Sequence, residues 1–174
     1  MLRNFFSRLF GKPRGEPQPQ KGSSEEQGAR CLDEIKASLQ ADFSFLISTY
    51  GFREIDERYG GLGACFVILQ NELMRLRVSS GGGLGGYGWS VGNKDADLVF
   101  EMGSGWLNLL RFVNSKLGAN ELLPETGLKS WEPIPMELLR DKYSQVLVMH
   151  MPELSRLFRE HGRIDSIPDR ITAR

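Results

Sequence analysis

The hydrophobic positions along the chain change from a helical period to a strand-like alternation and then back to a helical period. A first helix is predicted from residue 25 to residue 50, and Gly51 is suited to end it in the left-handed conformation. A serine at position 23 or 24 can cap its amino terminus. The apolar residues at this helical spacing are Leu32, Ile35, Leu39, Phe43, Leu46 and Ile47.

Short β-strands are predicted in the middle of the chain. Residues 52–58 form a first strand, and Cys65–Leu69 is a continuous apolar run. Apolar and basic residues alternate in Leu73–Val78, so that one face of the sheet is shielded from water and the other presents Arg75 and Arg77. The turn between these two strands is predicted at residues 70–72.

The sheet is predicted to continue after a glycine-rich loop. Tyr87–Val91 returns as a further strand, and Leu98–Met102 supplies a last one. From Ser104 the pattern becomes helical and stops at Gly118; another helical region extends from residue 138 to 158, where Pro152 should kink or divide the helix. We therefore expect an α+β fold: a small antiparallel β-meander of three to four strands, packed by an N-terminal helix and C-terminal helices.

The amino terminus is predicted to lie outside this domain. Residues 11–24 are almost wholly Gly, Pro, Gln, Ser and charged residues, which indicates a disordered linker, whereas 25–162 is the domain and 163–174 a flexible tail. Residues 1–10 have the pattern of a basic amphipathic helix. Such a helix can lie on a membrane surface, dock in a partner's groove or pack on its own domain. Its membrane-contacting residues would be Leu2, Arg3, Phe5, Phe6, Arg8 and Leu9.

Composition and charge narrow the class of protein. The 174 residues are 40% hydrophobic and 25% charged, which is typical of one globular domain. No apolar run is long enough to span a membrane, and we expect a soluble protein. Residues 1–24 hold five basic residues against one acidic, a net charge of +4, so the remaining 150 carry −4. This acidic body argues against nucleic acid as a partner.

The two cysteines, Cys31 and Cys65, form no CxxC pair and no cluster with histidine. We interpret both as buried free thiols in a reducing compartment. The chain also begins without the apolar stretch of a secretory signal. The expected location is the cytoplasm, or the inner face of the membrane if the first helix binds lipid.

The glycine-rich loop GGGLGG at residues 81–86 formally matches the GxGxxG motif, as do residues 83–88. A dinucleotide fold needs that motif between a strand and a helix, but the segment that follows here has the pattern of a strand. We interpret the loop as a hairpin connection. Contact with a ligand or a partner is the alternative.

No group of residues in the sequence has the spacing of a catalytic or metal centre. His150 and His161 both fall on the last predicted helix, where packing and a helix-end role are the simplest interpretations. The paired acids lack the further ligands that a metal site requires. We therefore expect no enzyme activity, no cofactor and no metal.

Residues 45–117 resemble small bacterial proteins of the toxin-immunity kind and related uncharacterised families. The resemblance lies in a helix ending in YGF, in the hairpin ACFVILQNELMRLRV with its alternating arginines, and in the later segment GWLNLLRFVNSKLG. It covers under half of the chain. The resemblance implies a non-enzymatic, protein-binding role.

The sequence therefore predicts a domain that binds another protein through its exposed sheet face and glycine-rich loop. The expected contact residues are Arg75, Arg77, Gly83, Tyr87 and Trp89. Two alternatives stay open: a peripheral membrane adaptor that uses residues 1–10, and a small ligand-binding enzyme that uses the glycine-rich loop.

Overall fold

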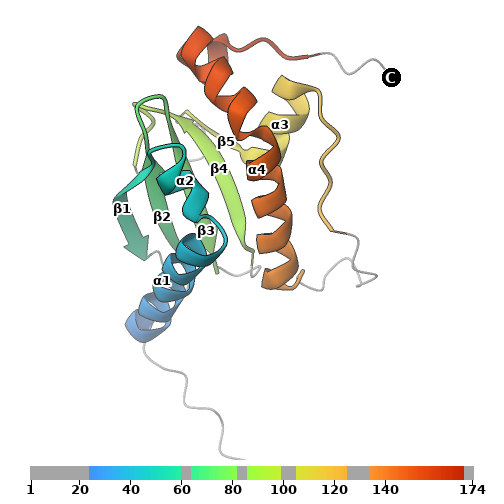
Figure 1. Ribbon diagram of the computed structural model, residues 1–174. Helices are drawn as coiled ribbons and strands as arrows, with labels where there is room; N and C mark the ends of the chain where they lie inside the picture. Colours follow the sequence, from blue (N-terminus) through green and yellow to red (C-terminus); the bar gives the residue numbers. More distant parts are fainter. Residues whose placement is uncertain (1–23, 60–63, 82–85, 99–104, 125–133, 171–174) are drawn as a thin grey trace, which may run out of the picture.

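The computed structural model describes residues 24–59, 64–81, 86–98, 105–124 and 134–170. The predicted linker and amphipathic helix at residues 1–23, and Gly83, lie outside these ranges. The chain folds as an N-terminal helical part, a sheet and a C-terminal helical part (Figure 1). The helices are α1 (Ser24–Ala41), α2 (Ser44–Ser48), α3 (Leu109–Leu117), α4 (Met136–His161) and the short 3-10 helix η2 (Ile164–Ser166).

The sheet is an antiparallel meander in which each strand pairs with the next one along the chain. The predicted α+β fold is thus confirmed, although the sheet has five strands rather than three to four. The strands are β1 (Arg53–Tyr59), β2 (Cys65–Gln70), β3 (Met74–Ser80), β4 (Gly88–Asn93) and β5 (Trp106–Asn108).

The fifth strand occupies part of a predicted helix. Trp106 and Leu107 pair with β4, and α3 begins only at Leu109. Asn108 sets this boundary because its side chain accepts a hydrogen bond from the Arg111 backbone N–H at 3.2 Å, which caps the helix. The helix ends at Gly118 in the left-handed conformation, as predicted. The strand predicted at 98–102 lies almost wholly outside the described residues.

The described helices α1, α2 and α4 lie on one face of the sheet (Figure 1). The largest of the fully buried side chains in the core between them and the sheet is Trp89, whose ring centroid is 4.7 Å from that of Phe43. Met74, Leu76 and Val78 of β3 point to the same side and are fully buried. Burial of this apolar face is the main stabilising contribution to the fold.

The last long helix continues through its proline. Pro152 cannot donate a backbone hydrogen bond, yet α4 is one helix of 26 residues and is not divided. The residues on both sides of the proline explain why, since Met151 and Leu154 are fully buried in the core. Packing against the sheet therefore outweighs the lost hydrogen bond.

The carboxyl-terminal residues up to 170 belong to the domain, which corrects the prediction of a flexible tail from residue 163. Ile164 and Ile167 are buried, and the Ile164 backbone N–H donates to Asn93 Oδ1 at 2.8 Å. The Arg170 backbone N–H donates to the Ser115 carbonyl at 2.8 Å. The two isoleucines have an apolar site beside α3 and β4, which a composition-based boundary could not show.

A disulfide joins Cys31 of α1 to Cys65 of β2, so the prediction of two free thiols is wrong. Packing of α1 on the sheet brings their Cα atoms to 6.1 Å, which is within the usual range for a disulfide. Such bonds persist mainly in oxidising compartments. The cysteines therefore no longer support the predicted cytoplasmic location. None of the helices in the described part of the chain has the length and apolar character of a membrane span.

We expect the disulfide to contribute about 3–4 kcal/mol to the free energy of unfolding, because it closes a loop across a sequence separation of 34. Urea unfolding of the wild type with and without a reductant, and of Cys31→Ala/Cys65→Ala, should show a loss of that order. The reduced protein and the double variant should agree. Equal stability of the oxidised and reduced forms would contradict the prediction.

Candidate functional site

The arginine-bearing face of the sheet is the predicted contact surface. The alternation predicted for β3 is confirmed, since its even-numbered residues are buried on the helix-covered face while Arg75 and Arg77 are half-buried on the opposite face. The register places Arg77 between Ile68 of β2 and Ser90 of β4. The two arginines thus lie where the sequence predicted them.

Both arginines are engaged by groups of the chain itself. Arg75 donates from Nε to Gln70 Oε1 at 2.7 Å and from Nη1 to the carbonyl oxygen of Ala96. The guanidinium of Arg77 lies 4.8 Å from the ring centroid of Trp106, a cation–π contact. Partial burial lowers the pKa of Arg77. The arginine face is therefore partly covered by other residues of the same domain.

Trp106 reaches this face because the neighbouring strand offers it a glycine. A Cβ at Gly92 would lie 2.7 Å from the Trp106 ring, too close for any larger residue at position 92 without a shift of the ring. The indole Nε1 then donates to the Asp97 carbonyl at 2.7 Å. The segment after β4 is therefore tied across the arginine face, through Arg75 as well as Trp106.

The aromatic members of the predicted contact set lie in the core. Trp89 is fully buried and Tyr87 is buried, so the expectation that they are exposed beside the arginines is wrong. The reason is the alternation of β4, where the small residues Gly88, Ser90 and Gly92 occupy the arginine face. Gly83 lies outside the described residues, but the glycine-rich loop does join two antiparallel strands, as predicted.

The structure brings His150 to a carboxylate rather than to a nucleophile. Its Nε2 lies 2.9 Å from Glu121 Oε1, and Lys142 Nζ lies 2.5 Å from Glu121 Oε2. These hydrogen bonds, with that from Lys142 the stronger influence, lower the pKa of Glu121. The backbone of Glu121 is also held, since Asn114 exchanges two side-chain hydrogen bonds with it. This cluster fixes the segment after α3 against α4.

Large apolar side chains are also exposed in this part of the molecule. They lie on α4 and on the segment fixed by Glu121, and they are between 41% and 66% exposed. We call them the α4 apolar surface: Leu122, Leu123, Leu138, Val148 and Met149. In Figure 1 the segment after α3 runs beside α4. Exposed apolar side chains that lie together are typical of surfaces that contact another molecule.

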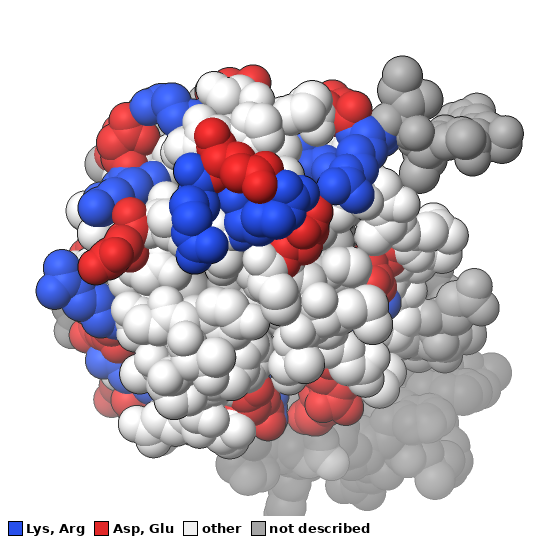
Figure 2. Space-filling model, turned by 45° about the horizontal axis from the view of Figure 1, so that its top comes forward, with Lys and Arg blue, Asp and Glu red and all other residues white. Residues whose placement is uncertain are grey.

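Charged residues are arranged differently along α4. Its C-terminal half holds an ionic network in which Arg156 pairs with Glu153 and Glu160, and Arg170 also reaches Glu153. Figure 2 shows Lys, Arg, Asp and Glu gathered in the upper part of this view above a broad area without charged side chains. The molecule therefore presents an uncharged area beside a strongly charged one.

Comparison with known proteins adds no family. Neither a family model, nor a curated protein, nor a solved structure matches this chain. The inference of function therefore depends on the geometry.

The α4 apolar surface did leave a signal in the sequence, because Val148 and Met149 lie outside the helical apolar stripe that packs on the sheet.

We expect Glu121→Gln to lower the free energy of unfolding by about 1 kcal/mol at neutral pH, because its hydrogen bonds to charged partners weaken. The folded-state pKa of Glu121 lies below its ordinary value of 4.5. Its contribution is therefore present above about pH 4.5 and is lost as the pH falls through the lowered pKa. Urea titrations of both proteins between pH 7 and pH 3 should show their stabilities converging.

The matched control for this prediction is Glu34→Gln on α1, an exposed acid. It should leave the free energy of unfolding almost unchanged over the same pH range. A constant difference between wild type and Glu121→Gln down to pH 3 would contradict the assigned role of the carboxylate.

Proposed function

We propose that this chain is a non-enzymatic protein-binding domain whose contact surface is the α4 apolar surface. The observation that carries the proposal is the exposure of five large apolar side chains on α4 and the adjoining segment. Exposing them to water is unfavourable, and a protein partner would remove this area from solvent. The arginine face, which the sequence favoured, is less suitable because its arginines are already engaged.

The ionic cluster supports the proposal because it holds the apolar side chains in place. Glu121 is bound by Lys142 and His150, so Leu122 and Leu123 directly after it are kept on the outside of the domain. A surface ordered before binding loses less conformational entropy when the partner arrives. Lys142 and His150 would then form the polar rim around an apolar centre.

The resemblance of residues 45–117 to toxin-immunity proteins implies the same class of role. It supports a protein, rather than a small molecule, as the partner of the chain, and it does not extend to the residues of the α4 apolar surface. The enzyme alternative gains no support from His150, whose Nε2 is taken by Glu121. The membrane-adaptor alternative stays a prediction, because residues 1–10 lie outside the described residues.

Site-specific photo-cross-linking tests the contact surface. A photoreactive amino acid placed at Met149 or Leu122 of the full chain should cross-link the same protein in cells of the source organism. The same group at Arg58, on β1, should not. The purified partner should then bind the wild-type chain, and Leu122→Ser/Met149→Ser should weaken that complex at least about tenfold through loss of two buried apolar contacts.

Ile47→Ser is the matched control, because Ile47 is a similarly exposed apolar residue on α2. It should leave the affinity unchanged. The proposal fails if positions 122 and 149 cross-link no common protein, or if the double variant binds the purified partner as tightly as the wild type does. Circular dichroism of each variant verifies that the fold is retained.

A further inference from the structure

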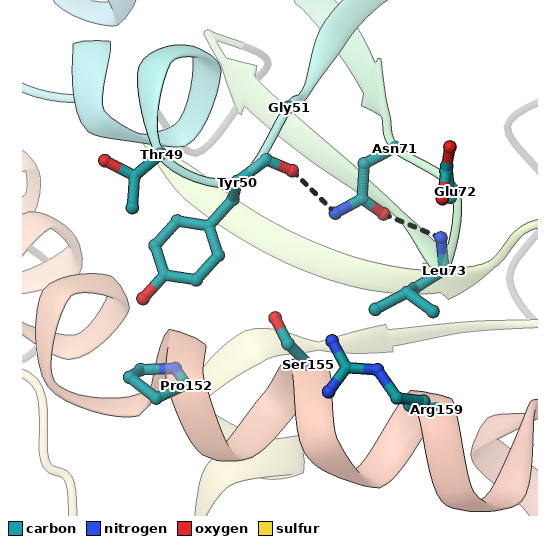
Figure 3. A pocket seen from close by; sticks show the side chains of 9 residues that line it. All are labelled: Thr49, Tyr50, Gly51, Asn71, Glu72, Leu73, Pro152, Ser155 and Arg159. Carbon is teal, nitrogen blue, oxygen red and sulfur yellow. Dashed lines mark hydrogen bonds between the residues drawn. The ribbon is translucent and has the colours of Figure 1, made fainter.

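A cavity of about 560 Å³ opens between α4 and two turns of the opposite layer (Figure 3). One turn leads from α2 into β1 and contributes Tyr50. The other joins β2 to β3 and contributes Asn71 and Leu73. Helix α4 closes the remaining side with Ser155 and Arg159. The cavity is separate from the α4 apolar surface.

Ser155 places a buried hydroxyl group in this cavity. The residue is 8% exposed, and its Oγ is buried without a hydrogen-bond partner in the described chain. Figure 3 shows the hydroxyl directed from α4 into the space below Asn71 and Leu73. Burying a hydroxyl without a partner is unfavourable. Packing of the core alone gives no reason for a serine here.

Arg159 brings an unpaired cation to the same space. Its guanidinium extends along α4 towards Ser155 (Figure 3). In the described part of the chain it has no ion pair, whereas Arg156, three residues earlier, binds two glutamates. The acidic residue of the cavity wall, Glu72, directs its carboxylate away from Arg159 in Figure 3. A positive charge is therefore available to a ligand.

The walls of the cavity are ordered by one side chain. Asn71 donates from Nδ2 to the Tyr50 carbonyl at 3.1 Å, and its Oδ1 accepts from the backbone N–H groups of Leu73 and Met74 at 2.9 and 3.0 Å. These bonds hold the two turns together. The shape of the cavity is thus fixed before a ligand enters, which favours binding.

We propose that this cavity binds a carboxylate, either that of a small organic acid or the terminal carboxylate of a peptide. The planar guanidinium of Arg159 matches a carboxylate with two parallel hydrogen bonds, and the Ser155 hydroxyl donates a third. The ring of Tyr50 and the side chains of Leu73 and Pro152 offer apolar contacts to the rest of the ligand. The single positive charge of Arg159 matches a ligand that carries one negative charge.

Titrations followed by ¹H–¹⁵N spectra of the full chain test the site. The probes are benzoate, with benzamide as its neutral counterpart, and N-acetyl-Gly-Gly-Phe, with its C-terminal amide as counterpart. At least one acid should shift the amide signals of Ser155 and Arg159 saturably, and the neutral counterparts should not. Binding of benzoate identifies a free acid as sufficient, and binding of the peptide acid alone identifies a chain terminus.

Three variants make the test specific. Arg159→Gln should weaken binding at least about tenfold, through loss of a charge-assisted pair. Ser155→Ala should weaken binding about threefold or more while leaving the unfolding midpoint unchanged or raised, because the hydroxyl has no partner to lose. Arg30→Gln, at an exposed arginine of α1, should change neither.

The proposal is overturned if neither acid gives a saturable shift, if the neutral amides bind as well as the acids, or if Arg159→Gln binds like the wild type. Its outcome is independent of the proposed protein contact. Leu122→Ser/Met149→Ser alters the α4 apolar surface and should leave carboxylate binding unchanged.

Discussion

Burial of Trp89 between the sheet and the helices is the interaction on which the rest of the structure depends. Its ring packs on Phe43 from the loop between α1 and α2, and its Nε1 donates to the Tyr87 hydroxyl at 3.2 Å. That hydroxyl lies 3.4 Å from Ser38 Oγ of α1, which completes a short buried polar chain. Burial raises the pKa of Tyr87, so the hydroxyl keeps its proton. The tryptophan thereby joins helix and sheet without an unpaired indole N–H.

The same burial determines the opposite face of the sheet. With Trp89 directed into the core, Gly88, Ser90 and Gly92 must point the other way. The absence of a side chain at Gly92 leaves room for Trp106, and Trp106 in turn supports Arg77. One large residue on β4 thus leads to the arrangement of the arginines on the other face of the same sheet.

The fold was largely predictable from local patterns, and the errors have identifiable causes. The alternation of β3 and the left-handed conformation of Gly51 and Gly118 are short-range signals, and the structure confirms them. The single helix predicted from residue 25 to 50 is wrong, because the chain forms α1 and α2 there and α2 ends at Ser48 with Thr49 as its C-cap. The predicted start of α3 was wrong because the pairing of Trp106 with Gly92 is a tertiary contact that a helical period hides. The disulfide was missed for the same reason, since only packing of α1 on β2 brings the two cysteines together.

The candidate sites were less predictable than the fold. The alternation of small and large residues in β4 indicates that Trp89 is buried. Exposure was predicted instead because Trp89 follows closely after the glycine-rich loop in the sequence. The sequence does not indicate that Ser155 and Arg159 line one cavity, because that cavity forms only where α4 packs opposite the turn at Asn71. The ion pairs of Glu121 with Lys142 and His150 were not predictable either, because the segment after α3 that carries Glu121 has no helical or strand-like hydrophobic pattern.

The two edge strands of the sheet limit how copies of this domain can associate. β1, at one margin, carries five charged residues among seven, and its pairing with β2 shifts register between Glu54 and Asp56. β5, at the other, has only three residues. Charge, irregularity and shortness each discourage the addition of a foreign strand. Association of this domain with other chains is therefore directed to side-chain surfaces, and growth of an extended intermolecular sheet is disfavoured.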